Sequence, residues 1–239
     1  ILKMHHGKSR LAMLTNFIPE FWMALTRGFP KLMLLAEFAG DDEQELEHKI
    51  QALNELVKHF NIKTKIVRSE DETDKYWTIR RESFNLLRNH MVERKAASFI
   101  EDVVVKPEYV AEFLPELNAI LHKHNLTYSI AGHAGDGNFH IFPLINFKSE
   151  AERESIFSVA DKVFALIKKY KGSNSGEHND GLVRTPYLYT MFSQEILDLF
   201  KKTKKIFDPE NIFNPGKKVA EGLHSRGSLD YVKSHIIQK

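Results

Sequence analysis

The chain contains no cysteine. This absence excludes disulfide bonds, a cysteine nucleophile, thiolate-ligated zinc and any iron–sulfur cluster held by the chain itself. A bound metal would therefore have to be ligated by histidine and carboxylate side chains. With 239 residues, of which 42% are hydrophobic, the chain is long enough to bury a core as one large domain or two small ones.

The sequence also lacks long apolar runs and a strong charge of either sign. Its richest apolar stretch, residues 29–38, has the length of a strand and falls short of the roughly 20 residues that span a bilayer. We therefore expect no transmembrane segment, and the net charge of only +2 gives no indication of a nucleic-acid partner. The sequence starts with neither Met nor a signal-peptide pattern, and we expect it to begin inside a longer chain.

Apolar periodicity predicts alternating strands and helices. Short apolar runs followed by turn residues indicate strands, whereas apolar residues spaced by three and four among charges indicate amphipathic helices. At least one antiparallel hairpin favours an α+β sandwich over a doubly wound parallel sheet. The predicted strands are residues 31–38, 62–67, 98–105, 128–130 and 139–146, and the predicted helices are residues 43–60, 74–91, 107–124 and 150–170.

The segment AGHAGDGNFH, residues 131–140, carries two histidines around a glycine-rich loop. Glycine supplies the positive φ angles of a tight reversal, so the segment is typical of a strand, a loop and a second strand. In that geometry His133 and His140 lie near each other at the mouth of a hairpin, where they could chelate one cation. The alternative is a hairpin whose histidines only form hydrogen bonds.

The segment GSNSGEHNDGLVR, residues 172–184, is dense in ionisable groups between two predicted helices. In an extended segment the neighbours Glu177 and His178 would point in opposite directions. Glu177 could then complete a metal site of two histidines and one carboxylate, while His178 faces a substrate as a general base. A solvated loop is the alternative interpretation.

Two further segments have weaker chemical signals. In YWTIRR, residues 76–81, one arginine of the helix can readily face inward, and such an arginine commonly grips a carboxylate through two hydrogen bonds. A surface salt bridge is an equal alternative. The segment FDPENIFNPGKK, residues 207–218, contains two successive turns after a lysine-rich helix end, which by itself indicates only structure.

Taken together, HAGDGNFH, SGEHNDG and FDPENIFNPGK closely resemble the C-terminal domain of FAD-linked oxidases of the vanillyl-alcohol-oxidase type. That family includes D-lactate, D-2-hydroxyglutarate and glycolate dehydrogenases. The resemblance implies a ferredoxin-like α+β sandwich, an antiparallel or mixed sheet with helices packed on it, over residues 1–219. Residues 220–239 would be a C-terminal extension, and the N-terminal FAD-binding domain would be absent from this chain.

The resemblance also implies roles for individual residues. His133, His140 and Glu177 fall on the family's metal ligands, and His178 falls on its proposed base. The metal would be zinc, manganese or iron. In addition, Arg80 falls on the arginine that holds the substrate carboxylate, and Asn214 and Lys217 lie where the family closes over the flavin.

The chain departs from the D-2-hydroxyglutarate branch at two positions. Phe142 stands where that branch has Asn, and Phe84 stands where it has a hydroxyl residue, which counts against a second, polar carboxylate pocket. The segment SFIEDVVVKPE, residues 98–108, is more similar to the branch in which the dehydrogenase is fused to, or works with, an iron–sulfur protein. Without cysteine, such a cluster would lie outside this chain.

The expected activity is FAD-dependent oxidation of a D-2-hydroxy acid, D-lactate-like, to the 2-oxo acid. The fragment alone is expected to be incomplete and inactive, and its location cytoplasmic or peripheral at the inner face of the membrane. Two alternatives remain open. A self-contained metal-dependent hydrolase would hydrolyse esters or phosphates without flavin, and a non-catalytic ferredoxin-like binding module would hold no stoichiometric metal.

Overall fold

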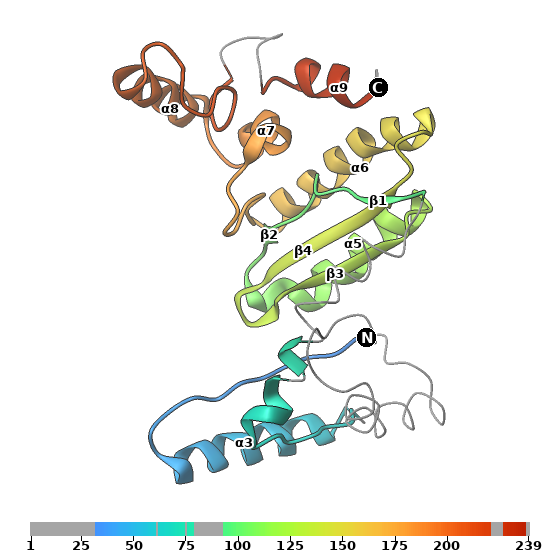
Figure 1. Cartoon of the computed structure of the whole chain (residues 1–239), viewed down its shortest axis with the longest axis vertical. Coiled ribbons are helices and arrows are strands. Elements are labelled where there is room, and N and C mark those ends of the chain that lie inside the picture. Colours follow the sequence, from blue (N-terminus) through green and yellow to red (C-terminus); the bar gives the residue numbers. More distant parts are fainter. Residues whose placement is uncertain (1–31, 61, 75, 79–92, 221–226, 238–239) are drawn as a thin grey trace. The chain divides into compact units, whose positions relative to one another are not determined.

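The computed structural model divides the chain into two compact units, residues 1–87 and residues 88–239. Each unit is described separately below. The residues that the structure describes are 32–60, 62–74, 76–78, 93–220 and 227–237 (Figure 1).

The described part of the first unit is built around helix α3, Glu43–Lys58. Its N-terminus is capped by Asp42, whose carboxylate accepts hydrogen bonds from the backbone N–H groups of Gln44 and Glu45 at 2.8 and 3.2 Å. This helix confirms the prediction at residues 43–60. Of the helix predicted at residues 74–91, the described residues 74 and 76–78 are helical, and the others lie outside the described part.

The two strands predicted in this unit are wrong where the structure describes them. Residues 32–38 and 62–67 have no regular secondary structure, and Leu32 and Leu34 are 73% and 68% exposed. A strand requires a neighbouring strand for its backbone hydrogen bonds. No strand pairing forms among the described residues of this unit, so an apolar run alone was a misleading signal.

The second unit contains an antiparallel sheet centred on β4, Asn138–Ile145. Strand β3, Tyr128–His133, runs along one edge of β4 (Figure 1). Two short strands, β1 (Lys95–Ala96) and β2 (Val103–Val104), pair with opposite ends of the other edge. The predicted hairpin is confirmed, whereas the strand predicted at residues 98–105 is reduced to β2 because Asp102 has a left-handed φ of 69°.

Two long helices complete the core of the second unit. Helix α5, Val110–Lys123, follows a 3-10 turn at Pro107–Tyr109, and α6 is Glu150–Lys169. Both helices were predicted. Their fully buried side chains and those of the sheet form one hydrophobic cluster, so the α+β sandwich is confirmed. The largest fully buried members are Phe113, Phe164, Ile100, Leu117, Leu121, Ile141, Ile145, Ile156 and Ile167.

Alternation along β4 separates this core from the functional face. Phe139 and Ile141 are buried in the hydrophobic cluster, so His140 between them points to the opposite face of the sheet.

Four helices follow α6 in the described part: α7 (Gly181–Arg184), a 3-10 helix (Thr185–Thr190), α8 (Gln194–Phe207) and α9 (Leu229–Ile237). Within the described residues, no helix is both long and apolar enough to cross a membrane.

We predict that Leu117→Ala lowers the free energy of unfolding by about 2–5 kcal/mol, because Leu117 is fully buried between the helices and the sheet. The matched control is Ile206→Ala, which truncates a side chain that is 74% exposed and should change stability by about 0.5 kcal/mol or less. Urea unfolding measures both values. Equal effects of the two substitutions would contradict the assignment of the core.

Candidate functional site

The hairpin places His133 and His140 on the same face of the sheet. Ala131 pairs with His140 and His133 pairs with Asn138, so the two histidines are diagonal neighbours, and their ring centroids are 5.7 Å apart. The turn between them depends on Gly137, which has a φ of 65°. A Cβ at Gly137 would lie 1.8 Å from the carbonyl oxygen of Val105, so glycine is required there.

The loop that carries Glu177 and His178 is attached to the edge of β2. Val104 N–H donates to the carbonyl oxygen of Ser173 at 2.9 Å, and Ser173 N–H donates back to Val104 at 2.8 Å. The chain then passes close over the sheet at Gly176. A Cβ at Gly176 would approach the Asn138 side chain to 2.4 Å, so a larger residue would have to displace the amide that binds Asp102.

The buried carboxylate of Asp102 holds this loop in place. It accepts hydrogen bonds from the backbone N–H groups of Gly176, Glu177 and His178 at 3.0, 3.1 and 2.8 Å. It also accepts from the side chain of Asn138 at 3.0 Å. Burial raises the pKa of the Asp102 carboxyl, but the hydrogen bonds from His178, Asn138, Glu177 and Gly176 outweigh burial and hold the pKa below its usual value.

Glu177 meets three imidazole rings. Its Oε1 atom lies 3.0 Å from His140 Nε2, 3.6 Å from His133 Nε2 and 3.3 Å from His178 Nε2. The expectation that Glu177 and His178 point in opposite directions is therefore wrong. That expectation assumed an extended segment, whereas three successive N–H groups bend around Asp102 and turn both side chains toward His140.

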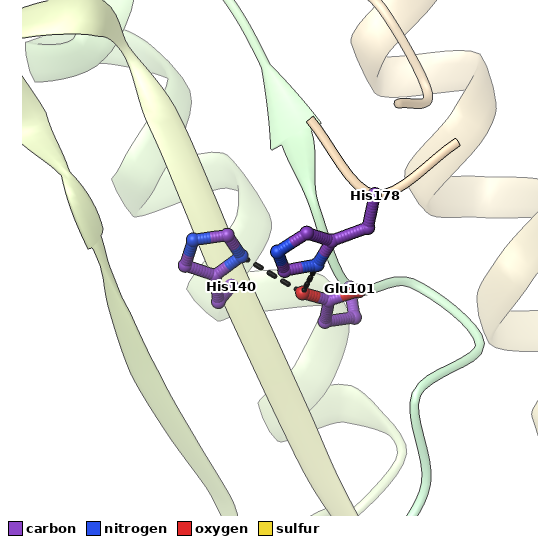
Figure 2. A group of neighbouring side chains, drawn as sticks. All are labelled: Glu101, His140 and His178. Atoms are coloured by element: carbon purple, nitrogen blue, oxygen red, sulfur yellow. Dashed lines mark hydrogen bonds and ion pairs between the residues drawn. The ribbon is translucent and has the colours of Figure 1, made fainter. Parts of the chain in front are cut away.

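A second carboxylate, that of Glu101, lies on the other side of two of these rings. Its Oε1 atom is 2.8 Å from His140 Nδ1 and 2.7 Å from His178 Nδ1, and dashed lines join it to both rings in Figure 2. The rings are stacked, with centroids 4.9 Å apart and planes 13° apart. Glu101 is only 6% exposed, so it belongs to the interior of the site.

Arg184 balances the buried negative charge of the two acidic residues. Its side chain is 7% exposed, and its Nη1 atom lies 3.5 Å from Glu101 Oε2 and 3.9 Å from Asp102 Oδ2. The guanidinium also donates to the backbone carbonyl oxygens of Glu101 and Asn179. A buried charge is tolerated only when it is paired and hydrogen-bonded, and Arg184 supplies both conditions.

Two of the other predicted residues, Asn214 and Lys217, lie on a turn outside this cluster. Asn214 and Lys217 are exposed on the turn after α8, and Lys217 Nζ donates to Asn214 Oδ1 at 3.2 Å. The same turn is tied to α7, because Lys218 forms an ion pair with Asp180 and its N–H donates to Thr185 Oγ1 at 2.8 Å. Arg80 lies outside the described residues.

Comparison with known proteins identifies the family. The family model for FAD linked oxidases, C-terminal domain, matches residues 23–218. The chain belongs to this family.

The chain is similar to several dehydrogenases and to an oxidase subunit. A D-2-hydroxyglutarate dehydrogenase of Escherichia coli is 32% identical over 77% of this chain and 19% of its own length. A D-lactate dehydrogenase of Anaerostipes hadrus is 31% identical over 77% of this chain and 38% of its own length. The glycolate oxidase subunit GlcD of Bacillus subtilis is 28% identical over 82% of this chain and 41% of its own length. The chain thus spans less than half the length of each relative.

The residues of this FAD-linked oxidase domain fit a divalent cation. His133, His140 and Glu177 each offer one ligand atom, and these atoms lie within 4.8 Å of one another. Two imidazole nitrogens and a carboxylate oxygen are a ligand set that suits zinc, manganese and iron. A second group with the same spacing consists of Glu101, His140 and His178. Because His140 belongs to both groups through different nitrogens, one group can hold the ion while the other positions the rings.

Glu101, Asp102 and Arg184 were not identified from the sequence. A signal was present, because two adjacent acidic residues interrupt the apolar run of residues 98–105, which was itself predicted to be buried. Acidic side chains are almost never fully buried without a partner, so their position in that run indicated a site.

We predict that Asp102→Asn lowers the free energy of unfolding by about 1–3 kcal/mol, because the amide offers one acceptor and brings a donor against the loop N–H groups. Hydrogen exchange should accelerate at the amides of Gly176, Glu177 and His178. The control is Asp198→Asn, at a half-exposed carboxylate on α8 that pairs with Lys201. Unchanged exchange at the three amides would show that Asp102 does not hold the loop.

Proposed function

We propose that this chain is the metal-holding and substrate-holding part of an FAD-dependent dehydrogenase that oxidises a D-2-hydroxy acid to the 2-oxo acid. The observation that carries the proposal is the convergence of three imidazole Nε2 atoms on one oxygen of Glu177, at 3.0 to 3.6 Å. Two of these nitrogens, on His133 and His140, and the Glu177 oxygen lie within 4.8 Å of one another, a spacing that lets them ligate one cation. Membership of the FAD-linked oxidases supplies the class of reaction.

The proposed ligands of the cation are His133, His140 and Glu177. When bound, a zinc, manganese or iron ion would polarise the hydroxyl and carboxylate oxygens of the substrate and lower the pKa of the hydroxyl. His178 would accept the hydroxyl proton at Nε2, which faces the same space as the ligands. The hydride of Cα would pass to FAD, and Arg80 would pair with the substrate carboxylate.

The flavin-binding part is the proposed partner of the surface around Asn214 and Lys217. Beside these residues, Phe207 and Phe213 are 82% and 68% exposed, and Ile206 and Ile212 are exposed to a similar extent. A patch of this kind on a soluble protein marks an interaction site. The relatives are about twice as long as this chain or longer, which supports a further domain as the occupant. Electrons would then leave the flavin for an external acceptor, for which we propose an iron–sulfur protein.

The substrate is proposed only as a class. The named relatives act on D-2-hydroxyglutarate, D-lactate and glycolate, which share a hydroxyl next to a carboxylate. Phe142 lies in β4, two residues after His140, and is half-buried. A phenyl ring has no hydrogen-bond donor, so this side chain offers no hydrogen bond to a second substrate carboxylate. This arrangement favours a monocarboxylate such as D-lactate. We further propose a cytoplasmic location, either free or at the inner face of the membrane.

We predict that the purified 239-residue chain binds up to one divalent metal, and that His133→Ala and His140→Ala each abolish this binding. The physical reason is that each histidine supplies one of three ligand atoms. His122→Ala is the matched control, because His122 contacts Tyr128 rather than this cluster. Elemental analysis measures the metal content, and an unchanged content in both ligand variants would remove the ligand assignment.

We also predict that Glu177 and His178 give separable defects in the complete enzyme. Glu177→Gln should lower metal occupancy and raise KM, and added metal should partly restore the rate because the defect is in affinity. His178→Ala should leave metal and FAD content intact while lowering kcat by about 10²–10⁴-fold, as expected for loss of a general base.

Steady-state kinetics with and without added metal distinguishes these two defects. If metal content falls in the His178 variant and stays full in the Glu177 variant, the two roles are exchanged. If neither substitution affects the rate, the active site lies elsewhere in the enzyme.

A further inference from the structure

We propose that Glu101 is a positioning residue that sets the tautomer of His140 and His178 at the same time, and so presents the Nε2 lone pairs of both rings to the site. The inference deepens the proposed function, and its metal-affinity readout depends on that function. The first observation is that one oxygen, Glu101 Oε1, lies within hydrogen-bond distance of both Nδ1 atoms, at 2.8 and 2.7 Å (Figure 2).

The direction of these two hydrogen bonds follows from the chemistry of the carboxylate. A carboxylate oxygen only accepts, so each Nδ1 must carry the proton and donate it. A neutral imidazole with its proton on Nδ1 has a free lone pair on Nε2. The Nε2 atoms of His140 and His178 face Glu177 at 3.0 and 3.3 Å, in contacts that lack the hydrogen-bond geometry of those with Glu101. Glu101 therefore prepares one ring as a metal ligand and the other as a base.

Arg184 lies against the oxygen of Glu101 that does not contact the rings. Its guanidinium lies 3.5 Å from Glu101 Oε2, on the oxygen that does not contact the rings, and both side chains are 7–8% exposed. Because Oε2 is the oxygen nearest to Arg184, Oε1 is left as the acceptor for the two histidines. Both Glu101 and His140 are buried, which limits the access of water to the hydrogen bond between them.

The same arrangement makes the Glu101→Gln substitution informative. Arg184 donates only, so it would attract the amide oxygen of the variant side chain and turn the amide NH₂ group toward the rings. The two N–H donors would then face the two Nδ1 atoms, which must become acceptors. Both protons would move to Nε2, where they block metal binding at His140 and proton acceptance at His178.

The test is a long-range ¹H–¹⁵N spectrum of the metal-free 239-residue chain, recorded about two pH units above the reference histidine pKa of about 6.5. In the wild type we expect a proton on Nδ1 of both His140 and His178, and in Glu101→Gln we expect Nδ1 of both rings to lack it. The matched control is Glu152→Gln, which alters a carboxylate that binds Arg94 through two hydrogen bonds of 2.7 and 2.9 Å beyond the other end of β4. The control should leave both tautomers unchanged.

The proposal is overturned if Nδ1 of either ring lacks its proton in the wild type, or if Glu101→Gln leaves both rings as they are in the wild type. The wild-type spectrum alone decides the first point even if the variant fails to fold. Thermal unfolding followed by circular dichroism identifies such a failure.

Titration with zinc alone, followed by calorimetry, gives a second readout. Zinc affinity should fall by about 10–100-fold in Glu101→Gln and stay unchanged in Glu152→Gln. If the tautomers behave as expected and the wild type binds no zinc, the metal part of the proposed function is wrong while the positioning role of Glu101 is supported.

Discussion

The site depends on the buried carboxylate of Asp102. Residues 175–178 form neither helix nor strand, so no ladder of backbone hydrogen bonds fixes their path. Three of their N–H groups donate to Asp102 instead, and the side chain of Asn138 joins the same carboxylate to the start of β4. The shared carboxylate thereby fixes the position of the loop relative to β4. The convergence of Glu177 and His178 on His140 follows from that constraint.

Two adjacent acidic residues, Glu101 and Asp102, have different structural roles in the site. Asp102 binds backbone N–H groups and fixes where the loop lies, whereas Glu101 binds imidazole rings and fixes how they are oriented. Burying two carboxylates side by side is costly because their charges repel and both lose hydration. Arg184 offsets this cost from a single position, and the left-handed backbone of Asp102 allows both side chains to reach the site. Fold stability and chemistry therefore share the same residues.

Local patterns were sufficient for the elements of the core. The helices at residues 107–124 and 150–170 and the hairpin around Gly137 were predicted because their apolar spacing and turn residues act within a few positions of one another. The sequence also predicted strands at residues 31–38 and 62–67, but their described parts form none. Strand formation depends on a partner elsewhere in the chain, and no local pattern reports whether that partner exists.

By itself the sequence determined the family and the α+β class. It also determined that His133 and His140 lie close together, since a hairpin with a short loop brings such residues to one face of the sheet. Only the tertiary structure decided the rest of the site. The direction of Glu177 depends on a bend around Asp102, which lies 75 residues earlier in the chain. Glu101 meets His140 and His178 across 39 and 77 residues. Contacts over such separations leave no periodic pattern in the sequence, because they arise from how the loop packs against the sheet.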